Sequence, residues 1–352
     1  MPDEIAAPRR RFWRRRRLLG GAATAIVVAA VFLFVLPRIA DYRDVWEVLK
    51  DLGWTDVLVL VAVTALNLVT FAPPWMIALP GLGFRHAFIL SQASTALSMV
   101  SPAGAAVGMA GSYTLLRSWG FSAGAVALAV ALTGVWNQLA NLVFPIAALA
   151  LLTGVDQDHP ALRTAAFVGI AVVVLVLATF ALALSSARRA RWIGGLAARL
   201  TTGVKRWFRR EPVTWGGEGL ARFRTSALGL LRRRWHGLTA ATLAGHLTVF
   251  LLLLVCLRVV GIAGGEISWI EAFAAWSLIR ILGALPITPG GVGIVEVGLS
   301  GALVAFGASN ADAVAATLLY RALAVLPTLA LGMLAAVTWR RHRPGDGLES
   351  PP

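Results

Sequence analysis

Charged residues are scarce in this chain, and acidic ones are the scarcest. Only 14% of the 352 residues are charged, and 17 aspartates and glutamates stand against 32 lysines and arginines. A soluble domain ordinarily has about 25% charged residues, whereas 58% of this chain is hydrophobic. The composition therefore excludes an ordinary soluble protein and predicts an integral membrane protein.

Cysteine is almost absent. The single Cys256 can form no internal disulfide and no cysteine-based metal cluster, so we expect it to be a small packing residue. The histidines predicted to lie in loops (His86, His159 and His236) lack the spacing of metal ligands. Neither a nucleophile elbow nor a P-loop sequence stands out. We therefore assign no catalytic residue, metal or cofactor, and we do not expect an enzyme.

Long apolar runs recur along the chain, and a membrane-spanning helix needs about 20 such residues. The six expected spans are Leu19–Leu36, Val57–Leu79, Ala123–Leu152, Ala165–Leu184, Leu238–Val260 and Ala313–Trp339. No Ala-x-Ala-like cleavage site follows the first run, so we expect it to remain as a span. The predicted fold class is all-α and polytopic.

The basic residues are concentrated in three patches. The tail 1–18, the segment 187–236 and the tail from Trp339 hold 23 of the 32 lysines and arginines, whereas acidic residues fill gaps between other spans. Segments rich in lysine and arginine stay in the cytoplasm. We therefore expect a cytoplasmic-membrane protein with both termini in the cytoplasm. A basic cytoplasmic face suits anionic lipid headgroups, and we do not expect nucleic acid as a partner.

Two further apolar regions, Ala87–Trp119 and Trp269–Phe306, carry proline and glycine in their middle. If the first were a single span, the later spans would be inverted and the basic segment 187–236 would lie outside the cell; if the second were, the basic C-terminal tail would lie outside. A re-entrant hairpin in each region removes the conflict. In the first region the turn is expected at Ser101–Ala106, and each arm is about 20 Å of helix, too short to cross. The second hairpin is expected to enter from the opposite face.

The two expected hairpins are related by a shift of 187 residues. Pro102 then aligns with Pro289, and Gly104 aligns with Gly291. Because the flanking spans keep the same offset, we expect an inverted repeat, which is a transporter architecture. The expected domains are the basic tail 1–18, a membrane domain 19–340 with repeat one at about 55–152, the basic segment 187–236 and repeat two at about 237–339, and the tail 341–352.

The stretch LPITPGGVGIVEVGL, Leu285–Leu299, puts glycines and a glutamate at membrane depth. Non-helical backbone is tolerated there only where protein or a water-filled cavity buries it. We expect free N–H groups at the start of the second half-helix, where they suit an anion such as phosphate. An intramembrane carboxylate indicates a functional site, and the candidate partners of Glu296 are Arg280 and Arg321. The alternatives are a glycine-packed helix pair without a ligand and a purely structural ion pair.

Polar side chains also occur within two expected spans. Asn137 and Asn141 are four residues apart and share a helix face, and His246 is a lone intramembrane histidine. We expect hydrogen bonds between helices at these positions, with a polar path and a proton relay as the alternatives.

The glycine-rich motif, followed by LLYRALAVLP (Leu318–Pro327) and Gly332, resembles the lysylphosphatidylglycerol synthase transmembrane region, or flippase-like domain, family. The resemblance covers about Asp41–Arg341. It implies a membrane protein that moves a lipid or lipid-linked headgroup between leaflets. The best-understood relatives flip aminoacylated phosphatidylglycerol, and archaeal relatives are linked to polyprenyl-lipid glycosylation. We expect the membrane part only, without the aminoacyltransferase domain.

The first hairpin departs from the family pattern. In VGMAGSYTLLR, Met109 stands in place of the family's acid and Ser112 in place of its arginine. The turn residues and the resemblance together give a set of expected substrate-binding residues. They are Pro102, Gly104, Gly108, Arg117, Arg280, Pro289, Gly290, Gly291, Gly293, Glu296 and Arg321.

These features predict a flippase-like translocator of an anionic phospholipid or lipid-linked headgroup across the cytoplasmic membrane. The alternative is an intramembrane enzyme or a non-catalytic accessory subunit in polyprenyl-phosphate or aminoacyl-lipid metabolism. The expected partners are an anionic membrane lipid or lipid-linked substrate and a lipid-modifying synthase or glycosyltransferase.

Overall fold

All regular secondary structure in the described residues is helical. The computed structural model describes residues 50–101, 104–155, 217–283 and 288–338, together with positions 43, 46 and 47 and isolated positions between 171 and 202. Within these residues the elements are α-helices and one 3-10 turn, which confirms the all-α prediction. The expected span Leu19–Leu36 and most of Ala165–Leu184 lie outside the described residues.

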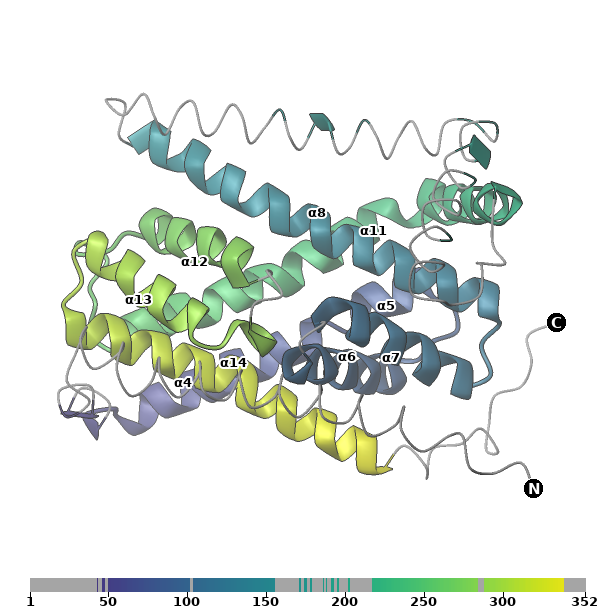
Figure 1. Cartoon of the computed structure of the whole chain (residues 1–352). Coiled ribbons are helices and arrows are strands. Elements are labelled where there is room, and N and C mark those ends of the chain that lie inside the picture. The colour runs from purple at the N-terminus through teal and green to yellow at the C-terminus, as the bar shows by residue number, and fades with distance from the viewer. Residues whose placement is uncertain are drawn as a thin grey trace, which may run out of the picture.

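Four stretches of the described chain are long and apolar enough to cross a membrane. They are α4 (Trp54–Thr70) with its continuation α5 (Pro73–Ala78), α8 (Ala123–Val155), α11 (Gly217–Val259) and α14 (Asn310–Thr338). In Figure 1 all four run lengthwise across the view, with α8 and α14 sloping one way and α4 and α11 the other. They correspond to four of the six spans expected from the sequence.

Helix α11 is much longer than the apolar run that predicted it. The expected span begins at Leu238, whereas the helix begins at Gly217. Hydropathy detects only the apolar part, and the arginines at 232–234 do not interrupt a helix because arginine is a good helix former. The last part of the basic segment 187–236 is therefore continuous with the span.

Two pairs of shorter helices fill the space among the long ones. The first pair is α6 (Phe84–Val100) and α7 (Gly104–Ser118), and the two helices pack on each other. The second pair is α12 (Trp269–Gly283) and α13 (Ile294–Ala305), which also pack on each other. Figure 1 shows the first pair in its right half and the second pair in its left half. The pairs therefore occupy opposite ends of the molecule.

The offset of 187 residues found in the sequence recurs in the backbone. At this offset Gly104 pairs with Gly291, and Gly120 pairs with Gly307. All four have positive φ: 37° at Gly104 and 67° at Gly291, and 88° at Gly120 and 118° at Gly307. The first residues of α8 and α14 are also 187 positions apart. Because a positive φ is a glycine conformation, the same backbone turns recur in both halves.

Each helix pair has its own apolar core. Around the second pair, Phe144, Phe250, Phe273 and Trp276 pack as an aromatic cluster with ring centroids 5.0–5.9 Å apart. Around the first pair the core is mainly aliphatic, and Leu90, Leu116, Leu132 and Leu238 are fully buried in it. The long helices α8 and α11 contribute to both cores and therefore connect the two ends.

Small residues allow the helices to approach closely. A Cβ added to Gly332 on α14 would lie 2.3 Å from the Cβ of Ala96 on α6, and one added to Gly108 on α7 would lie 1.9 Å from Oγ of Ser98 on α6. Lipid tails are as apolar as the side chains of the helices, so membrane helices associate through close packing of this kind rather than through the hydrophobic effect. These glycines hold α6 between α7 and α14.

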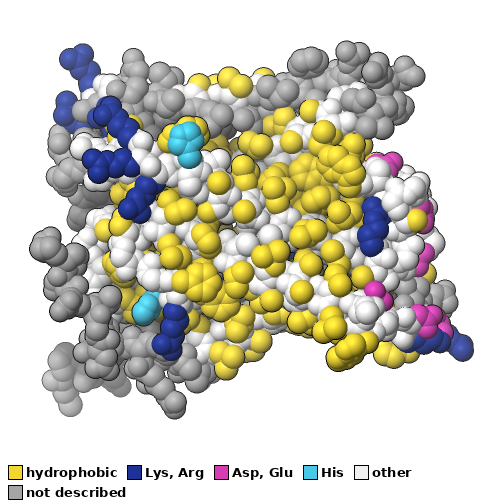
Figure 2. Space-filling model, turned by 180° about the vertical axis from the view of Figure 1, so that it is seen from behind, with side chains coloured by type: hydrophobic (Ala, Val, Ile, Leu, Met, Phe, Trp, Pro, Cys, Tyr) yellow, Lys and Arg dark blue, Asp and Glu magenta, His cyan; other side chains and the backbone are white. Residues whose placement is uncertain are grey.

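Charge is distributed unevenly along the helix direction. Figure 2 shows lysine and arginine side chains mostly at one end of this face, acidic side chains at the other, and a broad hydrophobic band between them. The first turns of α4, α12 and α14 contain Asp56, Glu271 and Asp312. A hydrophobic band between charged ends fits a protein embedded in a bilayer.

Candidate functional site

The second helix pair turns through a segment that only glycine can form without strain. Pro289 opens the 3-10 turn η2 (Pro289–Gly291), where its fixed φ is favourable. Gly290, Gly291 and Gly293 then adopt φ values of 62°, 67° and 89°. L-residues with a side chain rarely adopt this conformation, so the three glycines of PGGVG are required by the turn.

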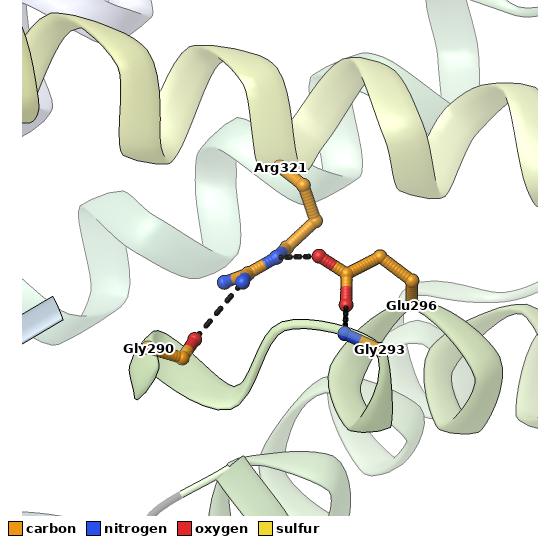
Figure 3. A network of polar contacts seen from close by, with 4 residues as sticks. All are labelled: Gly290, Gly293, Glu296 and Arg321. Atoms are coloured by element: carbon orange, nitrogen blue, oxygen red, sulfur yellow. Dashed lines mark hydrogen bonds and ion pairs between the residues drawn. The ribbon is translucent and has the colours of Figure 1, made fainter. Parts of the chain in front are cut away.

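Glu296 and Arg321 hold this turn in place. Arg321 on α14 donates from Nε to Oε1 of Glu296 at 2.7 Å and from Nη2 to the carbonyl oxygen of Gly290 at 3.0 Å. The backbone N–H of Gly293 donates to Oε2 of Glu296 at 2.6 Å. Figure 3 shows the four residues as one network between η2, α13 and α14. Both ends of the turn are therefore bound by side chains.

This network selects one of the two candidate partners and corrects one expectation. Arg321, not Arg280, pairs with Glu296. The N–H of Gly293, at the start of α13, was expected to be open to an anion, but it is occupied by Glu296. The physical reason is that a glutamate three residues into a helix reaches back to the residue before its first turn, as in a capping box. The N–H of Gly293 is therefore not open to an anion.

Arg280 lies on α12 and has a different environment. Its Nη2 donates to Oδ1 of Asn141 on α8 at 2.8 Å and lies 2.8 Å from Nδ1 of His246 on α11. Its guanidinium carbon lies 4.7 Å from the centre of the Trp276 ring, which is a cation–π contact. Its Nε has no hydrogen-bond partner among the described residues. Arg280 is thus bound on one side and unpaired on the other.

A cavity of about 600 Å³ lies between the tips of the two helix pairs. Its lining includes Ser98, Ser101 and Gly104 from the first pair, Asn141 from α8, Arg280 from α12 and Arg321 from α14. The tips touch beside it, because a Cβ added to Gly290 would lie 3.2 Å from the carbonyl oxygen of Met99 on α6. The cavity therefore has serine hydroxyl groups from the first pair on one wall, and the arginines of α12 and α14 also line it.

The structure brings together part of the expected substrate-binding set. Gly104, Arg280, Gly290 and Arg321 line the cavity. Pro289, Gly291 and Gly293 form the adjoining turn, and Glu296 binds Arg321.

Three other expected residues do not take part in the cavity wall that the structure describes. Gly108 packs against Ser98 between α6 and α7. Arg117 lies in the last turn of α7, is exposed, and donates to the carbonyl oxygen of Phe121. Pro102 lies outside the described residues.

At the two positions of the first pair where the resemblance led us to expect charge, the residues are uncharged. Met109 is 42% exposed on α7, and Ser112 is buried and donates to the carbonyl oxygen of Gly108. Neither residue lines the cavity. The described charged groups of the cavity therefore come from the second half of the chain.

Sequence reasoning did not place Asn141 and His246 in the expected site. Asn141 is 139 residues from Arg280 along the chain, and His246 is 34 residues from it. The available signal was the presence of isolated polar residues within apolar spans. That signal correctly predicted hydrogen bonds between helices, as with Asn137 and His246, but it did not indicate which residues would meet.

The glycine-rich motif PGGVG forms an ordered turn beside a cavity at the centre of a helical membrane protein. The sequence model for the lysylphosphatidylglycerol synthase transmembrane region matches residues 22–332. The chain belongs to this family. No curated protein matches the chain. Membership in the lysylphosphatidylglycerol synthase transmembrane region family identifies a multi-pass membrane protein with a lipid-related function.

Proposed function

We propose that this member of the lysylphosphatidylglycerol synthase transmembrane region family is a translocator that moves an anionic phospholipid or lipid-linked headgroup across the cytoplasmic membrane. The observation that carries the proposal is the charge of the central cavity. Two guanidinium groups, Arg280 and Arg321, line it, and one carboxylate, Glu296, pairs with Arg321. The excess positive charge suits a phosphate group, for which arginine has matching geometry.

The helix pairs support a translocator architecture. Their four helices contain 17, 15, 15 and 12 residues, which corresponds to about 18–26 Å of helix. The hydrocarbon core is about 30 Å thick, so we propose that the pairs are re-entrant hairpins from opposite faces. In this proposal each hairpin and its two flanking spans form one half of an inverted repeat, and Leu19–Leu36 and Ala165–Leu184 are the two further spans of a six-span protein. In such repeats the site lies at the midplane and opens alternately to each side.

The charge distribution supports an orientation for this repeat. Basic residues gather at one end of the face in Figure 2, and acidic residues gather at the other. Because lysine and arginine are retained in the cytoplasm, we propose that the basic end faces the cytoplasm. The first pair then enters from the cytoplasmic face and the second from the outer face.

Transport can be measured directly in proteoliposomes. The purified chain is reconstituted with fluorescent phosphatidylglycerol, its lysyl derivative or a polyprenyl-phosphate sugar, and leaflet accessibility is followed by chemical quenching. Faster exchange of at least one lipid than in protein-free liposomes is the expected result, with a slower rate for Glu296→Gln. Failure of the folded protein to move any of the three lipids would contradict the proposal.

A non-catalytic accessory role in lipid metabolism is the second candidate. The observation that favours it lies in the first pair, where the uncharged Met109 and Ser112 stand at positions for which the resemblance implies an acid and an arginine. A partner synthase or glycosyltransferase would then perform the chemistry. Copurification of such an enzyme, together with no transport by the isolated chain, is the result that would favour this role. Covalent change of a labelled lipid by the isolated chain would instead indicate an enzyme.

A further inference from the structure

The two arginines of the cavity differ in how their charges are compensated. The guanidinium of Arg321 is paired with Glu296 at 2.7 Å and with a backbone carbonyl. Within the described part of the chain, no carboxylate pairs with Arg280. A charged group at membrane depth is costly unless it is paired. Within the described residues, the positive charge of Arg280 therefore has no compensating carboxylate, whereas Glu296 compensates the charge of Arg321.

We propose that Arg280 is the residue that contacts the phosphate group in the cavity, and that His246 and Asn137 are positioning residues that aim it. In this assignment the Glu296–Arg321 pair holds the turn and does not bind the ligand. The inference rests on the proposed function, because it names the group within the cavity that receives the anionic headgroup.

A chain of hydrogen bonds fixes Arg280 from behind. A guanidinium can only donate hydrogen bonds, so Nδ1 of His246 must accept from Nη2 of Arg280. The ring proton then lies on Nε2, which donates to Oδ1 of Asn137 at 3.0 Å. Nδ2 of Asn137 in turn donates to the carbonyl oxygen of Thr133 at 2.9 Å. One nitrogen of the imidazole thus accepts a hydrogen bond and the other donates one, as in a neutral ring. The ring therefore orients the guanidinium without adding charge.

Aromatic rings hold the imidazole in this orientation. Phe71 and Phe144 each pack edge-on to the His246 ring, with centroids 5.8 Å away in both cases. His246 is 4% exposed. Trp276 lies against the guanidinium at 4.7 Å. The ring and the guanidinium therefore have little freedom to reorient, which is what pre-organised binding requires.

In the part of the chain that the structure describes, two residues that line the cavity each have a buried polar atom without a hydrogen-bond partner. Nε of Arg280 is buried without a hydrogen-bond partner among the described residues, and so is Oγ1 of Thr288. Both residues line the cavity, and Thr288 is only 6% exposed. Buried polar groups are normally satisfied. A phosphate in the cavity would compensate the charge of Arg280.

Binding of a soluble phospholipid tests this assignment separately from transport. The probe is dihexanoyl phosphatidylglycerol, and dihexanoylglycerol serves as the uncharged comparator. Titration of the full chain in detergent should show that Arg280→Gln weakens binding of the probe by about tenfold or more, since a hydrogen bond to a charged group contributes about 1.5–3 kcal/mol. Affinity for the comparator should not change.

Three sets of variants separate ligand contact from structural roles. The double variant Glu296→Gln/Arg321→Gln should lose less probe affinity than Arg280→Gln, because the pair holds the turn whereas Arg280 contacts the ligand. His246→Leu should lose affinity for the probe but not for the comparator. His246→Gln should retain it, because an amide can accept from Arg280 and donate to Asn137. Arg258→Gln is the matched control, since Arg258 binds the carbonyls of Ile262 and Ile267.

Each outcome decides a different point. Wild-type affinity in folded Arg280→Gln overturns the inference, and so does a larger loss of probe affinity in the double variant than in Arg280→Gln. If Arg280→Gln does not fold, the two His246 variants decide, and equal affinities for the probe overturn the inference. A wild type that moves lipid but shows no dependence on Arg280 leaves the proposed function standing. A wild type that neither binds the probe nor moves lipid removes both.

Discussion

Gly290 lies against the backbone of Met99, so the turn of the second helix pair rests on the end of α6 in the first. A Cβ at Gly290 would approach the carbonyl oxygen of Met99 to 3.2 Å and its Cα to 3.5 Å. The two pairs therefore meet through backbone atoms beside the central cavity. This contact couples the halves of the proposed repeat at the place where the ligand would bind.

Gly290→Ala should destabilise the protein for two reasons. The φ of 62° is unfavourable for alanine, which costs about 1–2 kcal/mol, and the added methyl group presses on Met99. Gly301→Ala is the matched control, because Gly301 is an exposed helical residue of α13 with no atom within 4 Å of an added Cβ. Thermal unfolding in detergent should show a lower midpoint for Gly290→Ala only. Equal midpoints would show that the turn adapts.

Glu296 and Arg321 should depend on each other for their contribution to stability. Glu296 is 3% exposed, and breaking a buried pair costs about 3 kcal/mol because one charge is left uncompensated. Arg321→Gln should therefore be strongly destabilising, whereas Glu296→Gln/Arg321→Gln should cost clearly less than the sum of the single variants. A double-mutant cycle of unfolding midpoints measures the difference. Strict additivity would mean that the two side chains act independently.

Gly332 should be intolerant of a side chain because α14 contacts α6 there. A Cβ at Gly332 would lie 2.3 Å from that of Ala96 and 3.2 Å from the carbonyl oxygen of Gln92. Gly332→Ala should cost about 1–3 kcal/mol through overpacking. Adding Ala96→Gly removes the closer clash and should recover part of the loss. An unfolding midpoint that does not rise with the second substitution would place the strain elsewhere.

The sequence predicted the turn well because its causes are local. A proline followed at once by several glycines strongly disfavours a continuous helix, and the structure turns there with Gly290, Gly291 and Gly293 at positive φ. The bounds of α11 were less predictable. Its basic first part forms helix without being apolar, so the apolar run marked only the membrane-embedded portion.

The partners within the site were harder to predict because they depend on how the helices pack. Two arginines were equally acceptable partners for Glu296, and only the placement of α14 against α13 selects Arg321. The contact between Arg280 and Asn141 joins residues 139 positions apart. The periodicity of apolar and polar residues within one helix does not indicate which residues of a distant helix it contacts. The same limit explains why His246 was recognised as polar and buried but not as a neighbour of Arg280.

The proposed opposed entry of the two helix pairs can be tested with matched cysteines. Ser122 and Ser309 are exposed and stand at equivalent positions, 187 residues apart, just before α8 and α14. Cys256 is buried and is the only cysteine, so Cys256→Ala supplies the background. A membrane-impermeant maleimide should label Ser122→Cys only in inside-out vesicles and Ser309→Cys only in right-side-out vesicles, because the inverted repeat puts these positions on opposite faces. Labelling of both from the same side would exclude the inverted repeat, and with it the alternating access on which the translocator proposal depends.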